Sequence, residues 1–275
     1  GTWVSSGMRR LFTTHIPGWE RDPGRLVQAV KIPPEEIWTA HQASKMRLLA
    51  GVMEQTGRQL DPDVLTIGFA RRAAQYKRAD LLLSNIRRLM EVGAGKIQLV
   101  FAGKAHPRDD GGKTVLQRLL TASQKVDEMI PIVFLENYDM EKGALITQGV
   151  DLWLNTPLRP REASGTSGMK CALNGVMNFS VLDGWWIEGW LEDVTGWSVG
   201  PEPSESDMMH YDESLDAIDL YDKLEKKIIP TYYHNREKWI WMMQRTIALN
   251  GSFFNTHRVT REYCEKAYNI SFRGM

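Results

Sequence analysis

From residue 64 onward, short apolar runs alternate with longer segments whose apolar residues recur at helical intervals. The apolar runs are bounded by glycine or polar residues and are typical of buried strands. They lie at 64–70, 97–103, 132–136, 150–154 and 178–182. The intervening segments predict helices at 76–92, 113–129, 140–147 and 167–174.

This alternation predicts an α/β fold with a doubly wound, Rossmann-like parallel sheet and helices on both faces. Residues 1–60 have a helical pattern, and Pro33-Pro34-Glu35-Glu36 marks a helix start. Residues 185–212 look irregular, and the tail from Ile218 looks helical. We therefore expect a helical lead-in over 1–60, a sheet core over 61–199, and a loop with C-terminal helices over 200–275.

Polar residues follow four of the predicted strands at the points where the strands end. In a parallel sheet with right-handed crossovers these points share one edge, where ligands bind. The sequence therefore predicts a site at this edge. The residues concerned are Arg71 and Arg72, Lys104, Asn137 and Tyr138, and the segment 162–170.

Basic residues surround the end of the first strand. Arg71 and Arg72 close it, and Lys77 is expected in the first turn of the following helix. Two guanidinium groups and an amine at a helix N-terminus favour a phosphate group. The alternative is an ordinary solvated helix start, and the residues alone leave both open.

The segment Glu162-Ala-Ser-Gly-Thr-Ser-Gly-Met-Lys170 places a carboxylate and an amine at the two ends of a small, flexible turn. Gly165 and Gly168 permit close backbone approach, and the turn can bind an anion at a helix start. A lysine withdrawn from water can form an imine with an aldehyde cofactor. An N-capped helix with a surface lysine explains the same residues, and the chemistry does not decide between the two.

Composition narrows the class of partner. Lys+Arg and Asp+Glu are equal at 34 each, so no global field favours nucleic acid or an anionic membrane. No apolar run approaches the ~20 residues that span a bilayer, and no signal peptide is evident. Two distant cysteines, Cys171 and Cys264, imply no disulfide framework and a reducing, cytoplasmic setting. The chain begins with Gly1 rather than Met, so we expect part of a longer protein.

Other candidate motifs have simpler explanations. Asp110-Gly-Gly-Lys-Thr114 resembles the end of a phosphate-binding loop, but Pro107 stands where that motif needs glycine. The six histidines show no metal-ligand spacing. Cys171 is expected to be a small buried residue. Trp185, Trp186 and Trp190 could stack on sugars, but packing in the core is favoured.

Taken with Asn174-Gly175 and Leu182-Asp183-Gly184, the segment 162–170 closely resembles the cofactor segment of the α-glucan phosphorylases. Arg71-Arg72, followed by Tyr76-Lys77-Arg78, resembles that family's upstream basic segment. Glu136-Asn137-Tyr138 and Asp151 also fall at matching intervals. The resemblance covers essentially the whole chain as the C-terminal half of a two-domain, glycosyltransferase-B-type enzyme.

The resemblance implies reversible phosphorolysis of α-1,4-glucans to glucose 1-phosphate with retention, and pyridoxal phosphate as cofactor. It implies that Lys170 holds the cofactor and that Arg71, Lys77, Tyr138, Thr166 and Ser167 bind it. Arg72 would bind inorganic phosphate, with Lys170, Arg72 and Lys77 as the catalytic set. Glu162, Ala163, Ser164 and Gly165 would bind the glucosyl unit.

The resemblance also implies partners: inorganic phosphate, an α-1,4-glucan and an N-terminal domain of the same enzyme, without which this chain is expected to be inactive. The sequence leaves homo-oligomer formation open. One alternative is a glucan-synthase-type transferase that uses a nucleotide-sugar donor, although such enzymes usually carry Glu where Lys170 stands. A non-catalytic carbohydrate-binding or assembly domain is the other.

Overall fold

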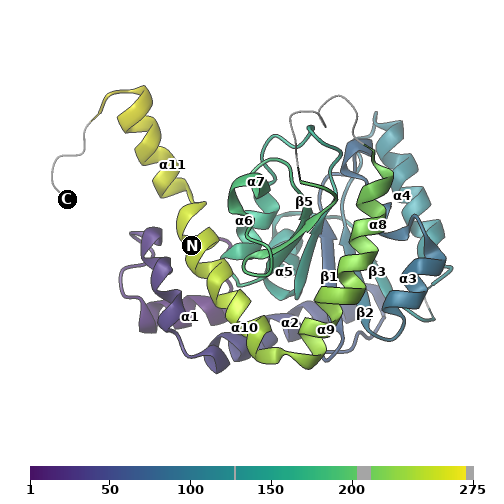
Figure 1. The fold of residues 1–275 in the computed structure, drawn as a ribbon, viewed down its shortest axis with the longest axis horizontal. Coiled ribbons are helices and arrows are strands. Elements are labelled where there is room, and N and C mark those ends of the chain that lie inside the picture. The colour runs from purple at the N-terminus through teal and green to yellow at the C-terminus, as the bar shows by residue number, and fades with distance from the viewer. Residues whose placement is uncertain (127, 203–211, 271–275) are drawn as a thin grey trace.

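Six parallel strands form a single sheet at the centre of the molecule (Figure 1). The computed structural model of this chain describes residues 1–126, 128–202 and 212–270. The strand order is β3-β2-β1-β4-β5-β6, the order of the doubly wound nucleotide-binding folds. The strands are β1 (Leu65–Ala70), β2 (Ile97–Ala102), β3 (Ile132–Leu135), β4 (Leu152–Asn155), β5 (Met177–Val181) and β6 (Gly196–Val199).

The strand order reverses between β1 and β4, which are hydrogen-bonded neighbours. Chain connections leave these two strands in opposite directions, and in folds of this kind ligands bind outside the carboxyl ends at such a point. Arg71 follows β1 directly, and Asn155 is the last residue of β4. The predicted ligand edge is therefore also the switch point of the sheet.

Helices cover both faces of the sheet, as the sequence predicts (Figure 1). One face carries α2 (Pro34–Thr56), α5 (Met140–Gly149) and α6 (Thr166–Ala172), and the other carries α3 (Ile86–Gly93), α4 (Asp110–Ser123) and α8 (Ser214–Lys223). All strand residues except Phe134 are buried, because a sheet covered on both sides buries both of its side-chain sets.

The N-terminal and C-terminal helices pack together beside the sheet (Figure 1). A left-handed glycine, Gly57, ends the long helix α2, and Asn235 caps α10 through its side chain. The elements are α1 (Ser6–His15), the 3₁₀ helix Pro23–Lys31, α9 (Ile229–His234), α10 (Arg236–Arg245), α11 (Thr256–Glu262), and π-helical turns at Leu224–Ile228, Thr246–Gly251 and Tyr263–Ala267.

The prediction of one helix over 76–92 is wrong. Two 3₁₀ turns, Gln75–Lys77 and Leu81–Leu83, precede α3, which begins only at Ile86. Arg78 ends the first turn in the left-handed region, with φ of 45°, and the Asn85 side chain caps α3 by accepting from the Arg88 amide. Lys77 therefore lies in a 3₁₀ turn and not at the N-terminus of an α-helix.

The prediction of an irregular stretch over 185–212 is also wrong where the structure describes it. This stretch contains the short helix α7 (Trp186–Gly189) and the sixth strand, β6, while residues 203–211 lie outside the described part. Gly196 lies so close to β5 that an added Cβ would be 2.0 Å from the Asn178 carbonyl oxygen. Gly196, a residue type that usually interrupts a strand pattern, is thus the first residue of β6.

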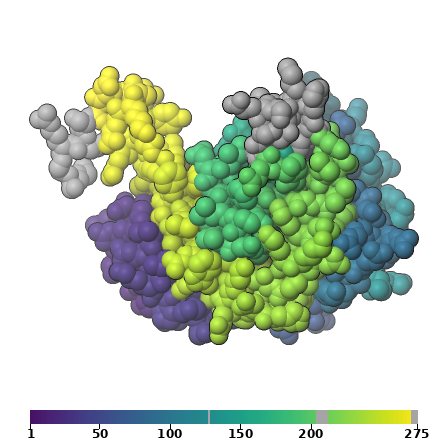
Figure 2. Space-filling model, viewed as in Figure 1, coloured from purple at the N-terminus to yellow at the C-terminus, as the bar shows by residue number. Residues whose placement is uncertain are grey.

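The end of the chain leaves the body of the domain. Helix α11 and the π-helical turn after it contain no buried residue. Figure 2 shows this segment, in yellow, projecting past the rest of the surface. Among the residues that the structure describes, no helix has the length and apolar character needed to cross a bilayer.

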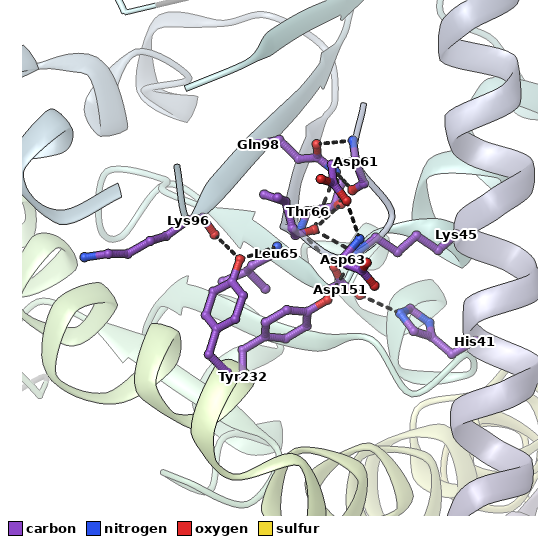
Figure 3. A network of polar contacts seen from close by, with 12 residues as sticks. His41, Lys45, Asp61, Asp63, Leu65, Thr66, Lys96, Gln98, Asp151 and Tyr232 are labelled. Atoms are coloured by element: carbon purple, nitrogen blue, oxygen red, sulfur yellow. Dashed lines mark hydrogen bonds and ion pairs between the residues drawn. The ribbon is translucent and has the colours of Figure 1, made fainter. Parts of the chain in front are cut away.

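A buried ion network lies at the opposite end of the sheet from the ligand edge (Figure 3). Asp151, just before β4, receives Lys45 Nζ at 2.6 Å and the Thr66 amide at 2.8 Å on Oδ2. His41 Nε2 lies 2.9 Å from Asp151 Oδ1, and Lys45 also donates to the Tyr232 hydroxyl at 3.1 Å. The network joins α2, β1, β4 and α9. The fully buried His41 is thus structural, as the sequence suggested.

Candidate active site

A cluster of one carboxylate and two cations lies at the switch point of the sheet. Glu162 Oε2 accepts from Arg71 Nη2 at 2.6 Å and from Lys77 Nζ at 2.5 Å. All three side chains are almost wholly buried. Glu162 Oε1 accepts no hydrogen bond from any described residue, so one carboxylate oxygen remains available. Two cations and one carboxylate leave the cluster with a net positive charge.

A chain of hydrogen bonds fixes Arg71 across the switch point. Arg71 Nη1 donates to Asn155 Oδ1, and Asn155 Nδ2 donates to Ser180 Oγ at 3.0 Å. Because the Ser180 hydroxyl itself donates to the Val181 carbonyl, it must accept from the amide nitrogen of Asn155. The amide orientation of Asn155 follows from this chain, and its oxygen faces the guanidinium group.

Arg78, next to this cluster, has a structural role. Its guanidinium group binds the Asp216 carboxylate of α8 and donates to the carbonyls of Thr156 and Pro157 at 3.0 Å each. It therefore ties the turn after β1 to the segment after β4 and to α8. This contact holds Lys77, one residue earlier, beside Glu162.

Unlike Arg71 and Lys77, Arg72 does not bind Glu162. Its side chain is exposed, and it forms no hydrogen bond or ion pair with a described residue. The geometry leaves this guanidinium group free to bind an anion from solution.

Residues that follow β5 hold the loop between β4 and α6 in place. The Glu162 amide donates to Asp183 Oδ2 at 2.8 Å, and the Trp185 amide donates to the Ser164 carbonyl at 2.9 Å. Gly165 caps α6 with φ of 83°, a conformation that glycine adopts without strain. Ala163 and Ser164 are exposed at the rim of the loop.

Lys170 lies within α6 and is half-buried. Its ammonium group lies 3.7 Å from the centre of the Trp3 ring, and it forms no ion pair or hydrogen bond with a described residue. Burial lowers the pKa of Lys170 from its usual value of 10.5, against a small opposing effect of Cys171. A lysine amine with a lowered pKa and no acidic partner is suited to covalent chemistry with a carbonyl group.

Tyr138, Thr166 and Ser167 are the remaining residues predicted to bind a cofactor. Tyr138 is partly buried against the core under α2 and α5, and burial raises its pKa. Thr166 is exposed, whereas the Ser167 hydroxyl accepts from the Trp153 indole of β4 at 3.2 Å.

Two residues of the site were not predicted to lie there. Trp3 contacts Lys170 from the start of the chain, and nothing in its sequence context indicates this. Asn155 ends a strand at the predicted edge, so its position alone could have indicated it. Cys171 is buried and burial raises its pKa well above 9.0, in agreement with the predicted packing role.

The fold and this edge define a doubly wound α/β protein with a cation cluster at the switch point of its sheet. The chain belongs to the carbohydrate phosphorylase family, whose model matches residues 26–195. Among curated proteins it is 40% identical to the maltodextrin phosphorylase of Thermococcus litoralis and 37% identical to the glycogen phosphorylase of Aquifex aeolicus. It is 42% identical to the glycogen phosphorylase of Mycobacterium tuberculosis.

These matches cover most of this chain and a smaller part of each relative. They cover 98% of the chain and 34% and 42% of the Thermococcus and Aquifex proteins, and 76% of the chain and 25% of the Mycobacterium protein. The chain thus spans roughly a third of the length of these relatives.

Proposed function

We propose that this chain is the cofactor-carrying half of an α-glucan phosphorylase. The reaction would be reversible phosphorolysis of an α-1,4-glucan, which gives glucose 1-phosphate with retention. The observation that carries the proposal is a pair of features joined by one short segment. Glu162 binds Arg71 and Lys77 at the ligand edge, and eight residues later α6 carries the Lys170 amine, which has no ion pair with a described residue. Family membership gives this arrangement its chemistry.

The residues fit pyridoxal phosphate as cofactor. Lys170 supplies an amine with a lowered pKa, Trp3 and Tyr138 supply aromatic surface, and the Arg71–Lys77 pair supplies buried positive charge. When bound, the cofactor would supply a phosphate group that exchanges a proton with inorganic phosphate. Lys170 would anchor it, Arg71, Lys77, Thr166 and Ser167 would bind its phosphate, and Tyr138 would lie beside the ring.

The substrates would meet at the exposed side of the cluster. Arg72 would bind inorganic phosphate, because its guanidinium group has no described partner. The free Oε1 of Glu162 would accept from a glucosyl hydroxyl while Oε2 keeps the two cations in place. Ala163, Ser164 and Gly165 would hydrogen-bond the sugar through the exposed loop. Two phosphates held side by side repel unless cations surround them and a proton is shared, which the cation-rich edge favours.

A second domain would be needed to enclose the glucan. The relatives are about three times as long as the matched region, so we propose that an N-terminal domain of the same polypeptide completes the cleft. This half alone is expected to show little turnover, since residues that close on the substrate and exclude water would be missing.

The test uses the full-length polypeptide supplied with pyridoxal phosphate, maltodextrin and inorganic phosphate. We expect formation of glucose 1-phosphate and near-ultraviolet absorption from the bound cofactor. Lys170→Ala should abolish both, whereas Lys125→Ala, at an exposed lysine that follows α4, should retain both. No cofactor absorption in the supplied enzyme, or turnover with a nucleoside diphosphate glucose in place of phosphate, would overturn the proposal.

A further inference from the structure

Trp185 lies behind the loop that carries the proposed site residues. It follows β5 and Gly184 and directly precedes α7, and only 4% of its surface is exposed. Its backbone amide donates to the Ser164 carbonyl at 2.9 Å, so the residue contacts the loop through main chain and side chain. The sequence favoured packing for this tryptophan, and its burial confirms it.

Glycines surround the Trp185 indole on two sides. On the loop side, a Cβ added at Gly165 would lie 3.2 Å from Trp185 Cδ1, and one at Gly168 would lie 2.8 Å from Cζ2. On the opposite side, a Cβ added at Gly189 would lie 2.6 Å from Cζ3. The indole thus fills the space that these three glycines leave. Because no slack remains, a displacement of the indole must displace the loop.

The far side of the indole is braced by the C-terminal region. The Phe254 ring packs edge-on against Trp185 with centroids 4.8 Å apart. Phe254 and Met169, which directly precedes Lys170, pack against the same small core of Leu182, Trp185 and Trp186. This core is separate from the two larger cores of the sheet, so the loop and α6 have their own apolar support.

We propose that Trp185 is a positioning residue that sets the conformation of the segment 162–170, the end of the β4–α6 loop and the start of α6, with Phe254 as its support. The proposal rests on the proposed function, because that loop carries the groups assigned to the glucosyl unit and to the cofactor. Trp185 touches none of the reacting groups in this assignment; it acts through Ser164, Gly165 and Gly168. A bound group misplaced by about 1 Å can lose about 100-fold in rate, which makes such a support functional.

Two substitutions in the full-length enzyme test this coupling. Gly189→Ala places a methyl group against the indole and drives it toward the loop. Trp185→Leu removes the indole atoms at 2.6 and 2.9 Å that this methyl group would meet first, and leaves only the Phe254 ring at 3.2 Å. We expect Gly189→Ala to lower kcat/KM for the glucan by about 10- to 100-fold in the wild-type background. It should have less than about a twofold effect in the Trp185→Leu background. Ile187→Ala, an exposed residue of the same helix, is the matched control and should retain full activity.

An equal effect of Gly189→Ala in both backgrounds would overturn the proposal, because the methyl group would then act without the indole. A second measurement does not depend on activity. In Trp185→Leu, hydrogen exchange should accelerate at the Gly168 amide, which is bonded to the Gly165 carbonyl, while β2 keeps its protection.

Unchanged exchange at Gly168 would overturn the proposal, because Trp185 would then have no role in the loop. An equal loss of protection in β2 would also overturn it, because Trp185 would then contribute only to the general stability of the domain. If the wild-type enzyme shows no phosphorolysis but the loop still loosens selectively, the proposed function is refuted and the positioning role of Trp185 is supported.

Discussion

The substitution Asp151→Asn tests the buried ion network at the amino ends of the strands. The carboxylate accepts from His41 and Lys45 and from the Thr66 amide, and its side chain is fully buried. Asparagine keeps the shape and can still accept through its amide oxygen, but it removes the charge, so the buried Lys45 ammonium loses its carboxylate partner. Removal of one partner from a buried pair costs about 3–5 kcal/mol.

The effect should also depend on pH. Burial alone would raise the pKa of Asp151, but the Lys45 charge and the His41 hydrogen bond outweigh it and lower the pKa from 3.8 to about 2. A lowered carboxyl pKa contributes stability that is present above the unfolded value and lost as pH falls through the folded value. From 3.8 to about 2, this contribution is roughly 2 kcal/mol. Asp151→Asn should therefore lose stability less steeply than the wild type between about pH 4 and pH 2.

Urea denaturation followed by tryptophan fluorescence measures both effects. At pH 7 we expect the free energy of unfolding to fall by about 3–5 kcal/mol, a large part of the usual 5–15 kcal/mol. Glu54→Gln, on the exposed side of the same helix as Lys45, is the control and should change it by less than about 0.5 kcal/mol. A loss for Asp151→Asn no greater than that of the control would refute the assigned role of the network.

Three further outcomes are expected. Gly184→Ala should lower Tm and raise KM for the glucan, because its Cβ would lie 2.5 Å from the Ser164 carbonyl oxygen; unchanged values would contradict the tight contact. Arg78→Met should lower the free energy of unfolding by about 3–5 kcal/mol by leaving Asp216 buried without its partner, and a double-mutant cycle with Asp216→Leu should show strong coupling. Arg72→Ala should raise KM for phosphate much more than KM for the glucan; equal changes would contradict its proposed role.

The alternation of apolar runs and helical segments was sufficient to predict the sheet and the edge that holds the site. Five of the six strands fall in apolar runs that the sequence pattern marks. The sixth does not, because β6 begins with a glycine and has a serine between its two apolar residues. Its strand character comes from pairing with β5, a tertiary contact that local pattern does not encode.

The site was predicted as a set of residues at one edge, without their pairing. Arg71 follows β1 and Glu162 follows β4, so the sequence predicted that both lie at one edge, since parallel strands end at a common edge. That Glu162 holds both Arg71 and Lys77 depends on the 3₁₀ turn after β1, where the periodicity had predicted an α-helix. The support by Trp185 was not predicted, because it depends on glycines at 165, 168 and 189 meeting around one side chain.

The projecting segment from Thr256 to Ala267 has a consequence for how the chain can be cut. None of its residues is buried, so its removal costs little of the apolar burial that keeps the domain folded. A version ending at Asn255 should melt at the same temperature as the parent while keeping Phe254 against Trp185. The appendage could then be exchanged or lengthened as an independent module.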